Sequence, residues 1–279
     1  MMREFAPAKV NLFLDVTRKR ADGYHDLGTH FVTLDFGDGL LGDLREDGLV
    51  TVSYAEDPGY PLEQDLVYKA AKLLQETVGV KLGAAFKMEK CLPQGAGLGG
   101  GSSDAAAALR LLNKLWRLGL SMEELEQLGR RLGADVPFLV RGGSAFAEGI
   151  GDLLEPVEFS STAFVLVGTP KCFVSTKEAY AGISPSGGER WQNFKRSYQA
   201  TTLAPYNKFE EVVFPQHPEI AELKENLLAL GAGAAAMCGS GASVFATFET
   251  EGAAQAALEK VAGSLRFGQV GKFRTEKFG

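Results

Sequence analysis

The residues with the clearest chemical meaning lie between Pro93 and Asp104 and read PQGAGLGGGSSD. Glycine reaches backbone conformations with φ > 0 and lets a ligand approach without a Cβ in the way. The Ala- and Leu-rich run that follows is typical of a helix. The stretch predicts a glycine loop that enters a helix N-terminus, where free N–H groups and the positive helix dipole favour a phosphate. The alternative is an ordinary turn with Ser102, Ser103 or Asp104 as a simple helix cap.

Two other phosphate loops fit this stretch less well. Gly95, Gly97 and Gly100 match the G-x-G-x-x-G pattern of dinucleotide-binding folds. That pattern also needs an acidic residue at the end of a second strand about twenty residues further on. The next acids, Glu123 and Glu124, instead resemble the first turn of another helix. The G-x-x-x-x-G-K-[ST] pattern does not occur in the sequence, so a nucleotide-binding dehydrogenase and a P-loop protein are both disfavoured.

Polar side chains also alternate with apolar ones over residues 9–16, which read KVNLFLDV. In a strand this alternation places Lys9 and Asn11 on one face, above an apolar backing. The strand therefore offers an ammonium group and an amide side by side. A half-exposed edge strand with a solvated lysine is the alternative.

Two further positions carry groups that could act on a ligand. Asp22-Gly23 is a hairpin signal, and it places Tyr24 and His25 at the start of the returning strand, either as a stacking wall or as plain strand surface. Asp135 follows the end of a helix and precedes Val136-Pro137. It is either the cap of the next short helix or a carboxylate free for chemistry.

Composition limits the class of protein. The chain has 279 residues, a net charge of −6 and 45% hydrophobic residues, as expected for a soluble globular protein of one large or two ordinary domains. The acidic balance argues against nucleic acid and anionic membranes as partners. Three separated cysteines and three histidines predict no zinc site. With no signal, transit or spanning segment recognised, we expect a reduced, cytoplasmic protein of bacterial type.

The order of elements predicts an α+β fold in two parts. Strands and helices alternate up to about residue 152, and the register changes near residues 150–160. The second half reads strand–helix–helix–strand–helix–strand, which is ferredoxin-like. Residues 184–200 are polar, and we expect them to form a mobile surface excursion.

Several separated segments resemble the 4-diphosphocytidyl-2-C-methyl-D-erythritol kinases, which are GHMP kinases of the non-mevalonate isoprenoid pathway. Residues 7–27, 92–109 and 132–152 carry this resemblance, in the order of the family, and residues 237–248 resemble the third GHMP motif. The AKVNL and ADGYH sequences are the specific part, because other GHMP kinases share the glycine loop without them. Two departures stand out: Asp65, where many members have Asn, and the MCGSGAS opening of the third motif.

The resemblance implies a fold and an activity. It implies a ribosomal-S5-like N-terminal domain over residues 1–152 and a ferredoxin-like C-terminal domain over residues 153–279. The implied reaction moves the γ-phosphoryl group of ATP, with Mg²⁺, to the C2 hydroxyl of the small-molecule substrate 4-diphosphocytidyl-2-C-methyl-D-erythritol. Another GHMP kinase, acting on mevalonate, homoserine or a sugar, and a non-catalytic GHMP-fold binding protein remain as alternatives. The sequence assigns neither an oligomeric state nor magnesium ligands, although Ser103 is a candidate ligand.

The resemblance also implies roles for individual residues. The catalytic pair falls on Lys9 and Asp135, and Asn11 lies against the methylerythritol. The cytidine end of the substrate meets Tyr24, His25, Thr176 and Tyr180. The ATP phosphate site falls on the glycine loop, namely Pro93, Gln94, Gly95, Ala96, Gly97, Leu98, Gly99, Gly100, Gly101, Ser102 and Ser103.

Overall fold

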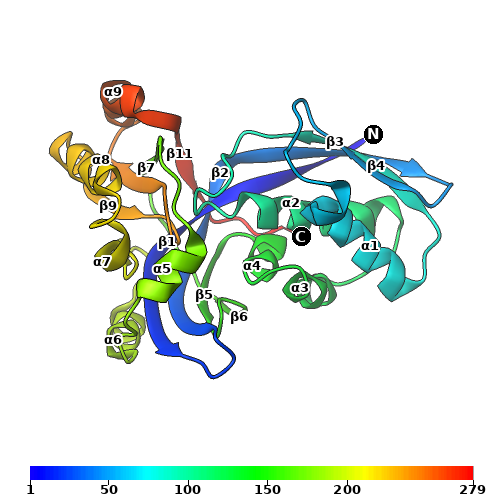
Figure 1. The fold of residues 1–279 in the computed structure, drawn as a ribbon, viewed down its shortest axis with the longest axis horizontal. Helices are drawn as coiled ribbons and strands as arrows, with labels where there is room; N and C mark the ends of the chain where they lie inside the picture. The colour runs from blue at the N-terminus through cyan, green and yellow to red at the C-terminus, as the bar shows by residue number, and fades with distance from the viewer. Residues whose placement is uncertain (279) are drawn as a thin grey trace.

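The computed structural model describes residues 1–278, and a long antiparallel pair of strands runs through both halves of the molecule. These strands are β1 (Met2–Lys19) and β2 (His25–Arg45), and in Figure 1 β1 crosses from the N-terminus to the hairpin at the far end. Their register shifts at three places, between Pro7 and Lys9, Asn11 and Phe13, and Val16 and Arg18. Such bulges bend a strand and increase its twist, so β1 supplies apolar side chains to the cores of both halves.

The N-terminal half is a sheet covered by helices. Strands β3, β4 and β2 are neighbours, and β5 pairs with both β2 and β6. The helices gather on one side of this sheet in Figure 1, where their apolar faces form one buried core. The elements are β3 (Val50–Ser53), a 3₁₀ turn (Leu62–Gln64), α1 (Leu66–Val78), β4 (Gly83–Glu89), α2 (Gly100–Leu115), α3 (Met122–Arg130), α4 (Val136–Arg141), β5 (Ser144–Glu148) and β6 (Leu153–Pro156).

The C-terminal half contains a four-stranded antiparallel sheet in the order β11-β7-β10-β9. This is the ferredoxin-like order, and α8 and α9 cover its outer face (Figure 1). The predicted two-part α+β fold is therefore confirmed. The elements are β7 (Phe164–Pro170), α5 (Thr176–Gly182), α6 (Glu189–Ser197), β8 (Tyr206–Asn207), α7 (Glu210–Val213), α8 (Pro218–Ala229), β9 (Ala234–Met237), β10 (Val244–Phe248), α9 (Glu251–Val261), a 3₁₀ turn (Ala262–Ser264) and β11 (Leu265–Arg274).

A narrow seam joins the two sheets. Strand β11 pairs with β7 along its length, and its last residues, Phe273 and Arg274, pair with Leu34 and Thr33 of β2. The Thr33 hydroxyl donates to the Arg274 carbonyl at 2.6 Å. The domain boundary expected after residue 152 stays a prediction, and β6, which follows it, pairs with β5 of the N-terminal half. In the part of the chain that the structure describes, no helix is both long and apolar enough to cross a bilayer.

The mobile excursion predicted for residues 184–200 is wrong, because this segment contains α6. Trp191 and Phe194 of α6 are 2% and 8% exposed, and the Phe194 ring stacks on Phe13 at 4.2 Å. The Trp191 indole N–H donates to Glu148 at 2.8 Å. Two aromatic residues three positions apart share one face of a helix, so a single buried stripe holds an otherwise polar segment in place.

Next to this aromatic cluster lies His30, which is fully buried. Its Nε2 atom lies 2.8 Å from the Ser144 hydroxyl, and the ring meets Phe146, Phe159 and Tyr198 edge-on at 5.2–5.6 Å. Burial lowers the pKa of His30 to about 3, because the charged imidazolium has no water around it. The native protein therefore holds a neutral histidine where the unfolded chain binds a proton.

This difference predicts loss of stability in mild acid. Below pH 6.5 His30 binds a proton in the unfolded state, whereas in the native state it stays neutral down to about pH 3. The unfolding free energy therefore falls as pH falls through this window. From pH 7 to pH 5 the contribution of His30 is about 2 kcal/mol. Urea unfolding across this range is the measurement. His30→Gln keeps a partner for Ser144 but cannot titrate, so its stability should fall less with acid; equal pH dependence in both proteins contradicts the assignment.

Candidate active site

The glycine loop lies where the sequence places it, and it enters α2 at Gly100. The residue at the N-cap position is Gly99, in a left-handed conformation with φ of 73°, and no side chain caps the helix. Ser102 and Ser103 therefore lie inside the helix. The simple-turn alternative requires one of these residues or Asp104 to cap the helix, and none of them does. The free N–H groups of the first turn remain available to a ligand with negative charge.

Gly97 packs against a second loop, residues 238–241, that follows β9. A Cβ atom at Gly97 would lie 2.0 Å from the Cys238 carbonyl oxygen, and the residue has φ of 77°. The Ser243 N–H also donates to the Ala96 carbonyl at 3.2 Å. The absence of a side chain at Gly97 is thus what allows the two loops, one from each half of the chain, to touch.

Two cavities meet at the glycine loop. The first, of about 390 Å³, is lined by Tyr54, Tyr60, Lys90 and the loop from Pro93 to Ser102. The second, of about 350 Å³, is lined by residues from both halves, namely Lys9, Asn11, Asp135, Ile150, Thr176, Tyr180, Phe209 and Ser240. Gly95, Gly97, Gly99 and Ser102 line both. A group bound at the loop is therefore accessible from either cavity, which is the geometry that a transfer between two ligands needs.

The Lys9 side chain is buried, and its ammonium group faces the second cavity. Its side chain is 4% exposed, and Nζ lies 2.9 Å from the Asn11 Oδ1 atom and 3.4 Å from the Asp135 carboxylate. The Phe31 ring lies 5.0 Å from Nζ. The alternative of a solvated edge-strand lysine is wrong, because a charge this buried needs the partners that Asn11 and Asp135 supply.

Asp135 does not use its side chain as a helix cap. It occupies the N-cap position of α4, but no backbone N–H donates to its carboxylate there. The carboxylate faces Lys9 and is 32% exposed. It also lies near the Tyr180 hydroxyl, whose pKa is raised by burial and further by the negative charge of Asp135. The carboxylate is thus free to accept a proton in the second cavity.

The remaining predicted residues lie around the same cavity at different depths. The Thr176 hydroxyl lies 3.0 Å from the Ser240 hydroxyl, and Tyr180 packs on His25 with ring centroids 5.3 Å apart. Burial lowers the pKa of His25, with Lys19 acting in the same direction, so a neutral imidazole faces Tyr180. Tyr24 is 62% exposed, and neither Tyr24 nor His25 lines the second cavity.

Known proteins share both the sequence and this architecture. Residues 65–143 match the N-terminal domain of the GHMP kinases, and residues 190–265 match their C-terminal domain. A 4-diphosphocytidyl-2-C-methyl-D-erythritol kinase from Nitrosospira multiformis is 45% identical over 263 residues, which cover 92% of this chain and 86% of that protein. The kinase of the same name from Bacillus cytotoxicus is 43% identical over 251 residues, 86% of each chain.

Solved structures of known kinases share the fold of this chain. A crystal structure of 4-(cytidine 5'-diphospho)-2C-methyl-D-erythritol kinase matches with a TM-score of 0.82 and 32% identity, and the match covers all of both chains. This chain belongs to the 4-diphosphocytidyl-2-C-methyl-D-erythritol kinase family of GHMP kinases. A homoserine kinase from Cytophaga hutchinsonii matches with a TM-score of 0.79 at 20% identity over 99% of this chain and 95% of that one, which shows the shared fold.

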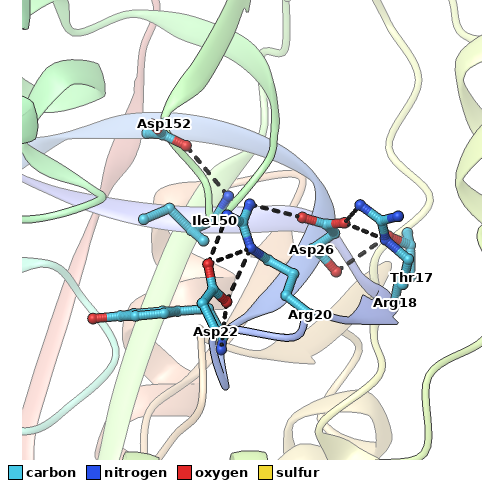
Figure 2. Close-up of polar contacts among 8 residues, drawn as sticks. Thr17, Arg18, Arg20, Asp22, Asp26, Ile150 and Asp152 are labelled. Atoms are coloured by element: carbon cyan, nitrogen blue, oxygen red, sulfur yellow. Dashed lines mark hydrogen bonds and ion pairs between the residues drawn. The ribbon is translucent and has the colours of Figure 1, made fainter.

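Figure 2 shows a cluster of ion pairs at the tip of the β1–β2 hairpin. We call this cluster, formed by Arg18, Arg20, Asp22 and Asp26, the hairpin clasp. Arg20 donates to Asp22 at 2.7 Å and to Asp26 at 3.3 Å, so it spans the turn that carries Tyr24 and His25. The Tyr24 N–H donates to Asp22 at 3.1 Å, and Arg18 pairs with the outer side of Asp26. The hydrogen bonds of Arg20 lower the pKa of Asp22. Arg20 was not among the predicted site residues, although its position beside Asp22-Gly23 was a usable signal.

Asp65 also has a structural reason to be an aspartate in this kinase. Its carboxylate caps α1 by accepting from the Val67 and Tyr68 N–H groups at 2.8 and 3.1 Å. Its second oxygen accepts from the hydroxyls of Tyr54 and Tyr60, which line the first cavity. Asp65 therefore fixes two aromatic walls of this cavity, which the sequence did not indicate.

Lys90 and Asn207 are further site residues that the sequence did not indicate. Lys90 donates to Asp104 at 2.6 Å and to the fully buried Asp38, and it forms a charged edge of the first cavity. Burial raises the pKa of Asp104, which the Lys90 ammonium opposes. Asn207 donates to the carbonyls of Met237 and Gly239 at 2.6 and 2.7 Å and so holds the second loop. Neither residue belongs to a local motif, so only the fold brings them to the site.

The contact at Gly97 predicts a specific loss. In Gly97→Ala the methyl group meets the Cys238 carbonyl, so the two loops must separate, and we expect ATP affinity to fall at least ~10-fold in a protein that still folds. Isothermal titration with ATP is the measurement. Gly119→Ala is the matched control, because Gly119 also has a positive φ, of 69°, but a Cβ there meets no atom within 4 Å. If both variants bind ATP equally, the close approach at Gly97 does not shape the site.

Proposed function

We propose that this chain transfers the γ-phosphoryl group of ATP to the C2 hydroxyl of 4-diphosphocytidyl-2-C-methyl-D-erythritol. The observation that carries the proposal is the pair of cavities that share one glycine loop, with Lys9 and Asp135 in the second. The names of the relatives supply the acceptor. Phosphoryl transfer depends on positioning and charge stabilisation more than on covalent chemistry, and this arrangement provides both.

The first cavity takes ATP. Residues Pro93 to Ser102 line it, and the first turn of α2 offers its N–H groups to the phosphates. Tyr54 and Tyr60 supply flat walls on which the adenine can stack. Ser103, included in the predicted phosphate site, is fully buried in α2 and lines neither cavity, so we assign it no contact with ATP.

The second cavity takes the acceptor alcohol. An alcohol is a poor nucleophile, and Asp135 is the general base that removes its proton as the phosphoryl group arrives. Lys9, at 3.4 Å, orients that carboxylate and stabilises the charge that develops on the transferred group. Asn11 orients Lys9 through its Oδ1 atom and presents a polar edge to the methylerythritol.

Mg²⁺ accompanies ATP in this proposal and neutralises phosphate charge when it is bound. Mg²⁺ prefers oxygen ligands and keeps several waters, so it needs one or two protein groups beside the phosphates. The Ser102 hydroxyl fits, because it lines the second cavity beside the glycine loop. The Ser103 hydroxyl is buried without a hydrogen-bond partner but faces neither cavity, so it is the weaker candidate.

The cytidine end lies toward the hairpin tip. His25 and Tyr180 form adjacent ring surfaces, and the neutral imidazole of His25 suits hydrogen bonding to an uncharged base. Thr176 and Ser240 supply hydroxyls at the mouth of the same cavity. Tyr24 reaches the base only from the exposed side, so we assign it an outer stacking role.

A substrate panel tests the function. ADP release is measured with ATP, Mg²⁺ and one acceptor at a time: the cytidylated methylerythritol, mevalonate, homoserine or a sugar. We expect turnover with the cytidylated substrate alone. Turnover with another acceptor assigns a different GHMP kinase activity, and ATP binding without turnover on any acceptor supports a non-catalytic protein.

Asp135→Asn separates the two roles of this residue. An amide cannot accept the hydroxyl proton, so we expect turnover to fall ~10²-fold or more, with both substrates still bound. The variant should still fold, but its melting temperature should fall because the buried Lys9 loses a charged partner. No helix cap is lost, because the Asp135 side chain makes no cap hydrogen bond. Steady-state kinetics and calorimetric titrations measure these quantities.

Lys9→Met and the double variant complete the test of the pair. Residues that act as one unit give non-additive losses, so the double variant should lose less than the product of the single losses. Near-normal turnover of Asp135→Asn means that the base lies elsewhere or is not needed.

Arg20→Met tests the hairpin clasp. Loss of both carboxylate contacts frees the turn that carries Tyr24 and His25, and we expect KM for the cytidylated substrate to rise roughly threefold to tenfold, as for the loss of two half-exposed ion pairs. KM for ATP should not change, since the clasp is remote from the first cavity. Arg18→Met is the matched control, because Arg18 pairs with Asp26 from outside and is 75% exposed. A similar KM in both variants argues against a positioning role for Arg20.

A further inference from the structure

Three side chains with metal-binding chemistry meet outside both cavities. Cys172 lies in the loop after β7, His217 precedes α8, and Glu219 lies in the first turn of α8. One ligand atom of each, the thiol sulfur, an imidazole nitrogen and a carboxylate oxygen, lies within 4.8 Å of the other two. The His217 Nδ1 atom and the Glu219 Oε1 atom are 3.7 Å apart. The sequence predicted no zinc site, because these residues come from segments far apart in the chain.

The spacing and the ligand types suit one class of ion. Tetrahedral zinc with bonds to N, O and S atoms sets its ligands about 3.3 to 3.8 Å apart, so small side-chain movements close this group around an ion. A thiolate with an imidazole disfavours Mg²⁺ and Ca²⁺, which take oxygen ligands. We propose that Cys172, His217 and Glu219 bind a zinc ion, with a fourth position open to water.

The surroundings allow the ion to enter. The side chains of His217 and Glu219 are 26% and 44% exposed, so water and ions reach the group. Without a metal, burial and the Glu219 carboxylate raise the pKa of the Cys172 thiol to about 12, and Arg266 acts in the opposite direction. Zinc replaces the thiol proton, which leaves to solvent as the sulfur–zinc bond forms.

The loop with Cys172 lies beside both cavities, which gives the ion a role. Next to Cys172, the Phe173 ring lies over the glycine loop, where a Cβ at Gly95 would come 2.7 Å from it. Three residues further on, Thr176 lines the second cavity. A zinc ion that joins Cys172 to the start of α8 therefore fixes a loop in contact with both substrate sites. The ion has a structural role, because it holds this loop against the start of α8, and it takes no part in phosphoryl transfer.

Cobalt is the probe, because a thiolate bound to Co²⁺ gives a charge-transfer band in the near ultraviolet. The full chain, without a histidine tag and freed of metal by chelation, is titrated with Co²⁺ and then Zn²⁺ in the absence of nucleotide. We expect one equivalent of Co²⁺ to produce the band, one equivalent of Zn²⁺ to remove it, and Zn²⁺ to raise the melting temperature.

Matched cysteine variants decide the outcome. Cys172→Ser should lose the band and bind Zn²⁺ at least ~10-fold more weakly, and Zn²⁺ should no longer raise its melting temperature. Cys91→Ser, which removes an exposed thiol outside the group, should behave as the wild type. His217→Ala should weaken binding while the band remains at high Co²⁺. No band in the wild type, or equal zinc affinity in Cys172→Ser, overturns the proposal, and neither result bears on the kinase activity.

Discussion

The buried charge of Lys9 is the constraint on which the rest of the site depends. An ammonium group removed from water is stable only with partners close by, and this one has the Asn11 amide oxygen, the Asp135 carboxylate and the Phe31 ring. Asn11 in turn accepts from the Gly239 N–H at 3.1 Å. One charge thus ties β1 to the start of α4 and to the loop after β9. The groups that stabilise Lys9 are the same groups that the proposed reaction uses.

Close packing of backbone around the glycine loop is a second constraint on the site. Gly97 leaves no room for a Cβ beside the Cys238 carbonyl, and a Cβ at Gly99 would lie 3.0 Å from the Lys9 side chain. The loop is therefore held between the Lys9 strand and the second loop, and this packing replaces the side-chain cap that α2 lacks. A phosphate site made of backbone N–H groups needs no reorganisation when charge develops.

Short sequence patterns predicted the features that depend on residues close together in the chain. The strand over residues 9–16, the glycine loop and the Asp22-Gly23 turn all appear in the structure, since each depends on neighbours in the sequence. Segment 184–200 was misread because its polar composition hides the buried Trp191 and Phe194, whose partners lie in β1 and β5. The supports from Asn207 and Lys90 depend on partners far along the chain. Such supports follow from tertiary packing, which no short pattern encodes.

The narrow seam between the sheets has a consequence for how the molecule assembles. The hydrogen bond between Thr33 and Arg274 joins residues 241 positions apart, and closing so long a loop costs more entropy than any contact within one half. The strand pairings within each half close shorter loops than this one. The second cavity draws Lys9 and Asp135 from one half and Thr176 and Ser240 from the other, so it exists only once the halves have docked. Catalytic competence therefore depends on the docking of the two halves, and neither half can supply it alone.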